Sequence, residues 1–150
     1  MKLFFANTTA VKVSRSLFLK GYQATKSVLN IATKESDQGI SVNLIGLKKM
    51  SRLNHQYRDK TGPTDTISFA YNDSQKFPGE NMLGEIFICL PFVKRQATKH
   101  RNSFHGELYA VFIHSLLHLY GYHHQTNRQE TIMKNLTEKI ITGTSENMVS

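Results

Sequence analysis

The segment that decides the fold of this chain is Phe112-Ile113-His114-Ser115-Leu116-Leu117-His118-Leu119-Tyr120-Gly121-Tyr122-His123-His124. Apart from its histidines it is almost entirely apolar, as in a helix buried in a protein core. His114 and His118 are four positions apart, so on a helix both imidazoles leave the same face about one turn apart. Gly121 tolerates the positive φ that ends a helix, and the chain can then turn back and bring His124 to the same point. The segment therefore predicts a three-histidine metal site on a helix and the turn that follows it.

The ligand set indicates which metal and which kind of site to expect. Three neutral imidazole nitrogens around one ion leave a fourth tetrahedral position open for water, which is typical of catalytic rather than structural zinc. We expect one Zn²⁺ per chain, held by His114, His118 and His124. Nickel or another divalent metal that favours imidazole is the alternative. A lone histidine on an apolar helix is more often a hydrogen-bonded core residue, but the spacing, the glycine and the third histidine together favour the metal site.

The other histidines are harder to assign. His123 neighbours His124 and could replace it as the third ligand, donate to a substrate phosphate, or have no role. The Gly-x-x-His spacing favours His124. His55, His100 and His105 have no ligand spacing, and we treat them as ordinary surface or core residues.

The pattern His-x-x-x-His-x-x-Gly-x-x-His is also that of the metzincin proteases, and one difference matters for the chemistry. Those enzymes carry Glu directly after the first histidine, as the general base that takes a proton from the metal-bound water. This chain has Ser115 there, and a serine hydroxyl cannot hold that proton at neutral pH. The ligand pattern is present without the peptidase base, so peptide hydrolysis is disfavoured.

Length and composition predict one domain over residues 1–150, a single metallohydrolase domain with a polar, frayed tail at 143–150. A hydrophobic content of 39% and a charged content of 20% are ordinary for a soluble globular protein and exclude a fibrous or membrane-embedded one. The apolar run near the N-terminus is too short for a signal-peptide core, so we expect a cytoplasmic protein with no membrane association. Cys89 is the only cysteine, which suits a reducing compartment.

The charge balance points to a polyanionic partner. The chain has 19 Lys and Arg against 11 Asp and Glu, a formal net charge of +8. Such an excess on a small domain attracts nucleic acid through sequence-independent phosphate contacts. The basic residues are dispersed along the sequence and form no tail-like run, so a basic protein that binds no nucleic acid is the alternative.

Hydrophobic periodicity predicts an α+β domain in which one mixed sheet of about four strands packs with helices. Apolar alternation predicts strands, 3.6-residue periodicity predicts helices, and the Asn-, Gly- and Pro-containing stretch 72–82 predicts a surface loop. Four of the expected helices have an apolar stripe that should face the core. In 14–33 it is Leu17, Ala24, Val28 and Ile31, and in 48–57 it is Met50, Leu53 and Tyr57. In 104–120 it is Leu108, Val111, Phe112, Leu116 and Leu119, and in the helix from Thr126 it is Ile132, Met133, Leu136 and Ile140. The expected strands are 2–6, 40–44, 66–71 and 84–90, and the expected helices are 14–33, 48–57, 91–100, 104–120 and one from Thr126, which has a capping-box partner in Gln129.

A second segment adds to the metal pattern: Leu53-Asn54-His55-Gln56-Tyr57-Arg58-Asp59-Lys60-Thr61-Gly62-Pro63-Thr64-Asp65-Thr66-Ile67-Ser68-Phe69. Together with Gly84-Glu85-Ile86 and the three-histidine segment, it resembles the YbeY family of bacterial metal-dependent endoribonucleases. The resemblance covers about residues 40–138 and includes Leu-Asn-x-x-Tyr-Arg, Pro-Thr-Asp-x-x-Ser-Phe, Gly-Asp/Glu-Ile and His-x-x-x-His-x-x-Gly-Tyr-x-His in order. The chain has Ser115 where the family usually has Gly, and His123 where it usually has Asp. The second change leaves open any role of that acid in orienting the ligand or moving a proton.

The resemblance implies a single-strand-specific, zinc-dependent endoribonuclease that matures the 3′ end of 16S ribosomal RNA and takes part in ribosome quality control. Its partners would be ribosomal RNA and the small ribosomal subunit. The resemblance carries metal binding to His114, His118 and His124, and a catalytic role to Arg58. The chemistry agrees, because a metal lowers the pKa of bound water from about 15.7 towards 7, and a forked guanidinium suits the charge that develops on phosphate oxygens.

Other polar residues have simpler interpretations. Arg58 stands beside Asp59, and without the family pattern an arginine in such a loop is more often a solvated surface charge. Asp65 precedes a strand, where a turn-stabilising hydrogen bond explains it better than a role as general base. Glu85 and Glu107 remain possible proton carriers.

Two alternative functions compete with the ribonuclease. A zinc-dependent hydrolase of a small-molecule or peptide substrate would use the same ligands, but it lacks Glu at position 115 and leaves the +8 charge unexplained. A non-enzymatic ribosome assembly factor, with a metal that only braces the fold, explains the charge. It gives the open fourth position on the metal no purpose.

Overall fold

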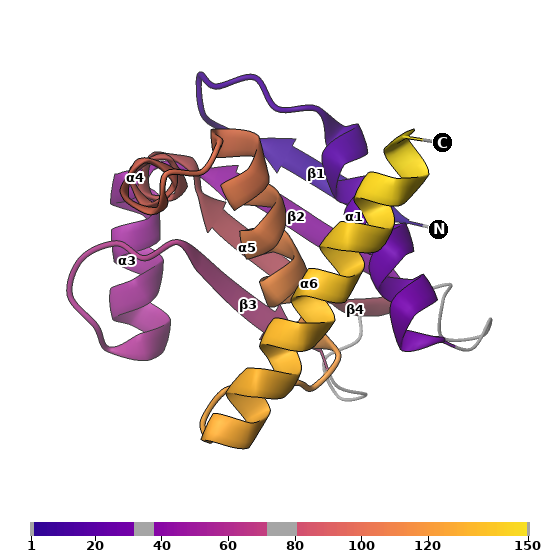
Figure 1. Ribbon diagram of the computed structural model, residues 1–150. Helices are drawn as coiled ribbons and strands as arrows, with labels where there is room; N and C mark the ends of the chain where they lie inside the picture. Colours follow the sequence, from indigo (N-terminus) through magenta and orange to yellow (C-terminus); the bar gives the residue numbers. More distant parts are fainter. Residues whose placement is uncertain (1, 32–37, 72–80, 150) are drawn as a thin grey trace.

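The computed structural model describes residues 2–31, 38–71 and 81–149. Its sheet has four strands in the order β1-β2-β4-β3, namely β1 (Leu3–Asn7), β2 (Gly39–Ile45), β4 (Met82–Cys89) and β3 (Thr66–Ala70) (Figure 1). β1, β2 and β4 run parallel, whereas the edge strand β3 is antiparallel to β4. The predicted mixed sheet of an α+β fold is therefore confirmed.

Five helices in the described part of the chain surround this sheet. They are α1 (Arg15–Leu29), α3 (Leu47–Arg58), α4 (Leu90–His100), α5 (Phe104–Leu119) and α6 (Asn127–Val149). One face carries the main core, to which α1, α5 and α6 contribute alongside the strands. Helix α3 closes a smaller cluster with Ile45, Ile67 and Cys89, and Ile45 and Cys89 follow core residues in their strands and so point to the opposite face.

Helix α5 is the element that positions the histidines. It begins after Ser103, whose Oγ accepts a hydrogen bond from the backbone N–H of Gly106 at 3.0 Å. The whole predicted stripe of this helix is buried, and α5 crosses the sheet between α4 and α6 (Figure 1). Because burial holds the helix on several sides, the His114 and His118 side chains start from a rigid base.

The predicted inward face of α1 is displaced by one residue from the buried face in the structure. The fully buried positions are Phe18, Gly21, Tyr22 and Thr25, while Leu17, Ala24 and Val28 are only partly buried beside them. The helix ends at Leu29, and Asn30 after it has the left-handed conformation, so the helix does not continue towards residue 33 as predicted. Residues 32–37 lie outside the described part of the chain. Gly21 explains the shift, because a Cβ there would lie 2.9 Å from Cε2 of Phe112. The close approach of α1 to α5 needs that glycine.

Two side chains that were expected in the core are exposed. Tyr57 at the end of α3 has an exposed fraction of 56%, and Ile132 in α6 has 41%. The buried place on α3 is taken by Asn54, which is 3% exposed and donates from Nδ2 to the carbonyl of Gly62 at 2.9 Å. Asn54 is favoured at this buried position because its side chain provides a hydrogen bond to a carbonyl of the following loop.

The last helix starts as predicted and runs further. The N–H of Gln129 donates to Thr126 Oγ1 at 3.1 Å, and the N–H of Thr126 donates to Gln129 Oε1 at 3.2 Å, which confirms the capping box. Where a frayed tail was expected after Gly143, α6 continues to Val149. One glycine costs a helix about 1 kcal/mol and no proline follows it, so the sequence contains no strong stop signal. The predicted loop at 72–82 lies outside the described residues except for its end, where Met82 already belongs to β4.

We expect Gly84→Ala to destabilise the protein by roughly 1–3 kcal/mol, because a Cβ there would meet the backbone oxygen of Phe69 and lie 2.7 Å from Cδ2 of Leu119. The matched control is Gly143→Ala, where a Cβ would meet nothing within 4 Å. Alanine in that helix should stabilise by up to about 1 kcal/mol. Urea unfolding of the three proteins measures both changes. Equal stability of the two variants would contradict the tight packing of α5 on β4.

Candidate metal centre and its cleft

The structure brings the rings of His114, His118 and His124 together at one point. Their ligand nitrogens lie within 4.8 Å of one another, and Nε2 of His114 is 3.1 Å from Nε2 of His118. The ring of His124 is stacked on that of His114 with centroids 5.3 Å apart, and its centroid is 5.0 Å from that of His118. The predicted cluster on a helix and the segment after it is confirmed, and its donor set fits a small divalent ion.

The turn after α5 orients one of these rings. Gly121 has a φ of +95°, as its place after the helix predicted, and its N–H donates to the carbonyl of His118 at 3.0 Å. The turn places the carbonyl of Tyr122 2.8 Å from Nδ1 of His118. Nδ1 then carries the proton and donates it to that carbonyl, which leaves Nε2 with a free lone pair directed at its partners.

Burial favours the neutral form of two of the three rings. It lowers the pKa of His114 to about 4, an effect that the rings of His118 and His124 increase and that Asp65 opposes. Burial also lowers the pKa of His118, with the Tyr122 carbonyl opposing the shift and His124, His123 and Arg58 adding to it. Near pH 7 both rings are therefore unprotonated, the state that a metal ligand requires.

Ser115, the residue where a metzincin has its general base, points elsewhere. It is fully buried, and its Oγ donates to the carbonyl of Val111 at 2.9 Å and lies 2.8 Å from Oγ1 of Thr66. The hydroxyl links α5 to β3 and does not face the cluster. The sequence predicted that Ser115 would not replace the peptidase base, and its position supports this.

His123 lies beside the cluster and not within it. Its ring centroid is 6.4 Å from that of His118, and the group of mutually close ligand atoms includes His124 instead. His123 is exposed and lines the same cleft. It is therefore placed to face a molecule in the cleft.

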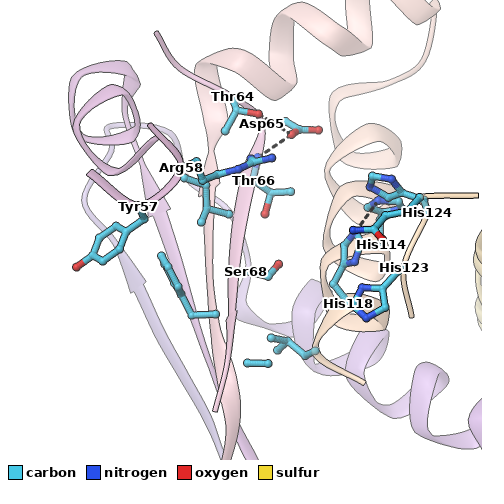
Figure 2. Close-up of a pocket in the computed structure, with 15 residues that line it drawn as sticks. Tyr57, Arg58, Thr64, Asp65, Thr66, Ser68, His114, His118, His123 and His124 are labelled. Atoms are coloured by element: carbon cyan, nitrogen blue, oxygen red, sulfur yellow. Dashed lines mark hydrogen bonds between the residues drawn. The ribbon is translucent and has the colours of Figure 1, made fainter. Parts of the chain in front are cut away.

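The cluster forms one wall of a cleft of about 690 Å³. The other wall comes from the end of α3 and from β3, and Figure 2 shows Arg58 and the segment around Asp65 across the cleft from the histidines. Tyr57 also lines the cleft, but its ring points away from the histidines (Figure 2). Arg58 precedes the first of the three histidines by more than fifty residues, and the structure brings all four side chains to one cavity.

Asp65 is hydrogen-bonded at the entry to β3, although not to the N–H two residues on that an Asx turn would use. Its Oδ1 accepts from the N–H of Thr66 at 2.8 Å and from Oγ1 of Thr64 at 3.3 Å, and its Oδ2 accepts from Nε2 of Gln96 at 3.3 Å. A carboxylate with these partners fixes the entry to β3 and ties it to α4. It also lines the cleft and acts electrostatically on His114.

A second cleft of about 620 Å³ adjoins the first and was not anticipated from the sequence. The two clefts share four residues, namely Asp65, Thr66, His114 and His124. In the second cleft Glu107, only 8% exposed, accepts from Asn102 Nδ2 at 3.0 Å and pairs with Nδ1 of His100 at 2.9 Å. His100 and Glu107 lie in different helices and have no ligand or capping spacing, so this pair was not predicted from the sequence. Glu85 lines neither of these clefts and faces a third one.

Comparisons with known proteins identify the family. The family model described as Endoribonuclease YbeY matches residues 6–145. A curated Endoribonuclease YbeY from Fusobacterium nucleatum subsp. nucleatum is 36% identical over 122 residues, which cover 79% of this chain and 75% of the relative. Another from Ureaplasma urealyticum serovar 10 is 30% identical over 142 residues, covering 94% of this chain and 90% of the relative.

A solved structure supports the fold. The solution structure of a protein from Thermotoga maritima matches with a TM-score of 0.61 and covers 97% of this chain and 93% of its own, at 24% sequence identity. In the part of this chain that the structure describes, no helix is both long and apolar enough to span a bilayer. From the family model and the curated relatives, this chain belongs to the YbeY family of endoribonucleases.

Proposed function

We propose that this chain is a single-strand-specific, zinc-dependent endoribonuclease that matures the 3′ end of 16S ribosomal RNA and takes part in ribosome quality control. It would act as a single domain in the cytoplasm, on ribosomal RNA in the small ribosomal subunit. The observation that carries the proposal is one cleft, in a chain of this family, that has three close imidazoles on one wall and a guanidinium on the other. The preference for single strands and for the 3′ end is taken from the family resemblance.

The metal would be held by His114, His118 and His124. Their nitrogens are close enough to reach one ion, and the lowered pKa values of His114 and His118 leave those two rings unprotonated. A zinc ion bound there supplies a Lewis acid for attack on a phosphodiester. The hydrogen bond from His118 Nδ1 to the Tyr122 carbonyl holds the ring in the orientation that such an ion needs.

Arg58 would bind the phosphate that is cleaved. It is the last residue of α3 and lies exposed in the cleft, close enough to His118 to lower the pKa of that ring. A guanidinium offers two parallel donors to the non-bridging oxygens and strengthens its hydrogen bonds as charge builds up on them. Arg58 is thus the residue assigned to orienting and stabilising the reacting phosphate.

The two alternative functions are less well supported. A peptide hydrolase needs a base beside the metal, and Ser115 at that position points towards β3. An assembly factor without activity does not require an arginine across the cleft from three clustered imidazoles. Purified metal-loaded protein, incubated with single-stranded and duplex RNA of the same sequence, separates them. We expect cleavage of the single strand only, and no cleavage of either RNA would contradict the proposal.

Arg58→Lys should leave the metal content unchanged and reduce RNA cleavage at saturating substrate by at least tenfold. Lysine keeps the charge but loses the fork, so a role in phosphate geometry predicts loss whereas simple attraction predicts retention. The matched control is Arg128→Lys, an exposed change on α6 outside the cleft. Cleavage by Arg58→Lys at the rate of that control would show that Arg58 contributes only charge.

The two adjacent histidines give a third test. We expect His124→Asp to lose metal affinity and cleavage, because the structure places His124 in the cluster, and His123→Asp to retain both. The second substitution restores the usual residue of the family, and a carboxylate near the ion can strengthen metal binding. Metal titration and single-turnover cleavage compare the variants. A collapse of metal binding in His123→Asp alone would mean that His123 is the third ligand.

A further inference from the structure

The net positive charge of this chain is concentrated in two helices. Helix α3, helix α4 and Arg101, the C-cap of α4, contain eight basic residues and no acidic residue, whereas the C-cap of α3 is Asp59. The rest of the chain contains eleven basic and eleven acidic residues and is neutral overall. All eight basic residues are exposed, and they are Lys48, Lys49, Arg52, Arg58, Lys94, Arg95, Lys99 and Arg101. The charge that is dispersed in the sequence is therefore localised in the fold.

The sheet brings these two helices together. Ile45 at the end of β2 is paired with Cys89 at the end of β4. Helix α3 begins two residues after the first of these and α4 directly after the second, so both helices start at the same edge of the sheet. Leu47 of α3 and Phe92 of α4 pack against one small core cluster, and Figure 1 shows both helices on the same side of the molecule. We call the eight residues the α3–α4 basic surface.

This surface reaches the metal cleft at one residue, and helix α4 contacts the cleft wall next to it. Its residue Arg58 lines the cleft directly. From α4, Gln96 donates to Asp65, which lines the cleft as well. The surface therefore begins at the cleft, where Arg58 ends α3.

The charges of the surface are not neutralised within the fold. Among the residues that the structure describes, none of the eight forms an ion pair with a carboxylate. Like charges on neighbouring elements repel and oppose the compact state, so such a cluster is stabilised by a polyanion. Six of the eight lie in the first two turns of α3 or along α4, away from the reacting phosphate assigned to Arg58.

We propose that the α3–α4 basic surface binds the phosphate backbone of single-stranded RNA next to the segment held in the cleft. The proposal rests on the proposed function, because a ribonuclease cleft beside the surface favours RNA, and not an acidic protein, as the polyanion that binds it. Exposed lysines act as point charges on phosphates, so the binding is independent of base sequence. The surface would raise affinity for long strands beyond what the cleft alone provides.

The test compares two charge-removal variants with one control. K48Q/K49Q/R52Q removes charge from α3 and K94Q/R95Q/K99Q removes it from α4, whereas K12Q/K20Q/K139Q removes three exposed charges elsewhere. The probe is a single-stranded 20-nucleotide 2′-O-methyl RNA, bound to metal-loaded protein at several salt concentrations. Each lost phosphate contact lowers the slope of log K against log salt by about 0.7, so each helix variant should lose roughly two from that slope. Affinity near 0.1 M salt should fall about tenfold, and the control should bind like wild type.

Thermal unfolding by circular dichroism checks that all variants are folded. Equal binding and equal salt slopes in the helix variants and the control would overturn the proposal, and would leave an acidic protein as the candidate partner. The proposed function fails separately, if wild-type protein binds the probe but cleaves no RNA. Loss of binding confined to the two helix variants supports the surface in either case.

Discussion

The burial of α5 against the sheet is the constraint on which the site depends. This helix is apolar on nearly every side, and its buried residues contact the strands and the helices α1 and α6 through one continuous core. Its partly exposed positions include His114 and His118, which face the cleft. Because the helix cannot shift without opening the core, the first two ligands are held at a fixed spacing, and only the third depends on a turn.

The same burial sets the electrostatics of the site. Desolvation disfavours protonated imidazoles, which keeps His114 and His118 neutral, and the Tyr122 carbonyl selects the useful tautomer of His118. The cationic groups lie where water reaches them, with Arg58 at the end of α3 and the rest of the α3–α4 basic surface beyond it. A polyanionic strand would thus meet exposed positive charge on its way to the histidine cluster.

The sequence predicted the elements with strong local signals and missed the features that depend on packing between elements. The spacing of His114, His118 and His124 with Gly121 predicted the cluster, and Thr126 with Gln129 predicted the start of α6. Periodicity could not place the buried face of α1, since its position follows from Gly21 meeting Phe112. It could not show that Asn54 would be buried and Tyr57 exposed, because a loop carbonyl decides that. The pairing of Ile45 with Cys89, which brings two basic helices together, is a long-range contact that has no local signature.

In the proposed function the three histidines hold a catalytic metal and not a structural one. The most direct measurement is removal of the metal with a chelator, with far-ultraviolet circular dichroism and cleavage of single-stranded RNA followed on the same sample. We expect cleavage to be lost while the helical signal and cooperative unfolding remain, since α5 is held by its apolar core. Cleavage should return as one zinc ion per chain is added back. Unfolding on loss of the metal, or undiminished cleavage by the metal-free protein, would contradict the account.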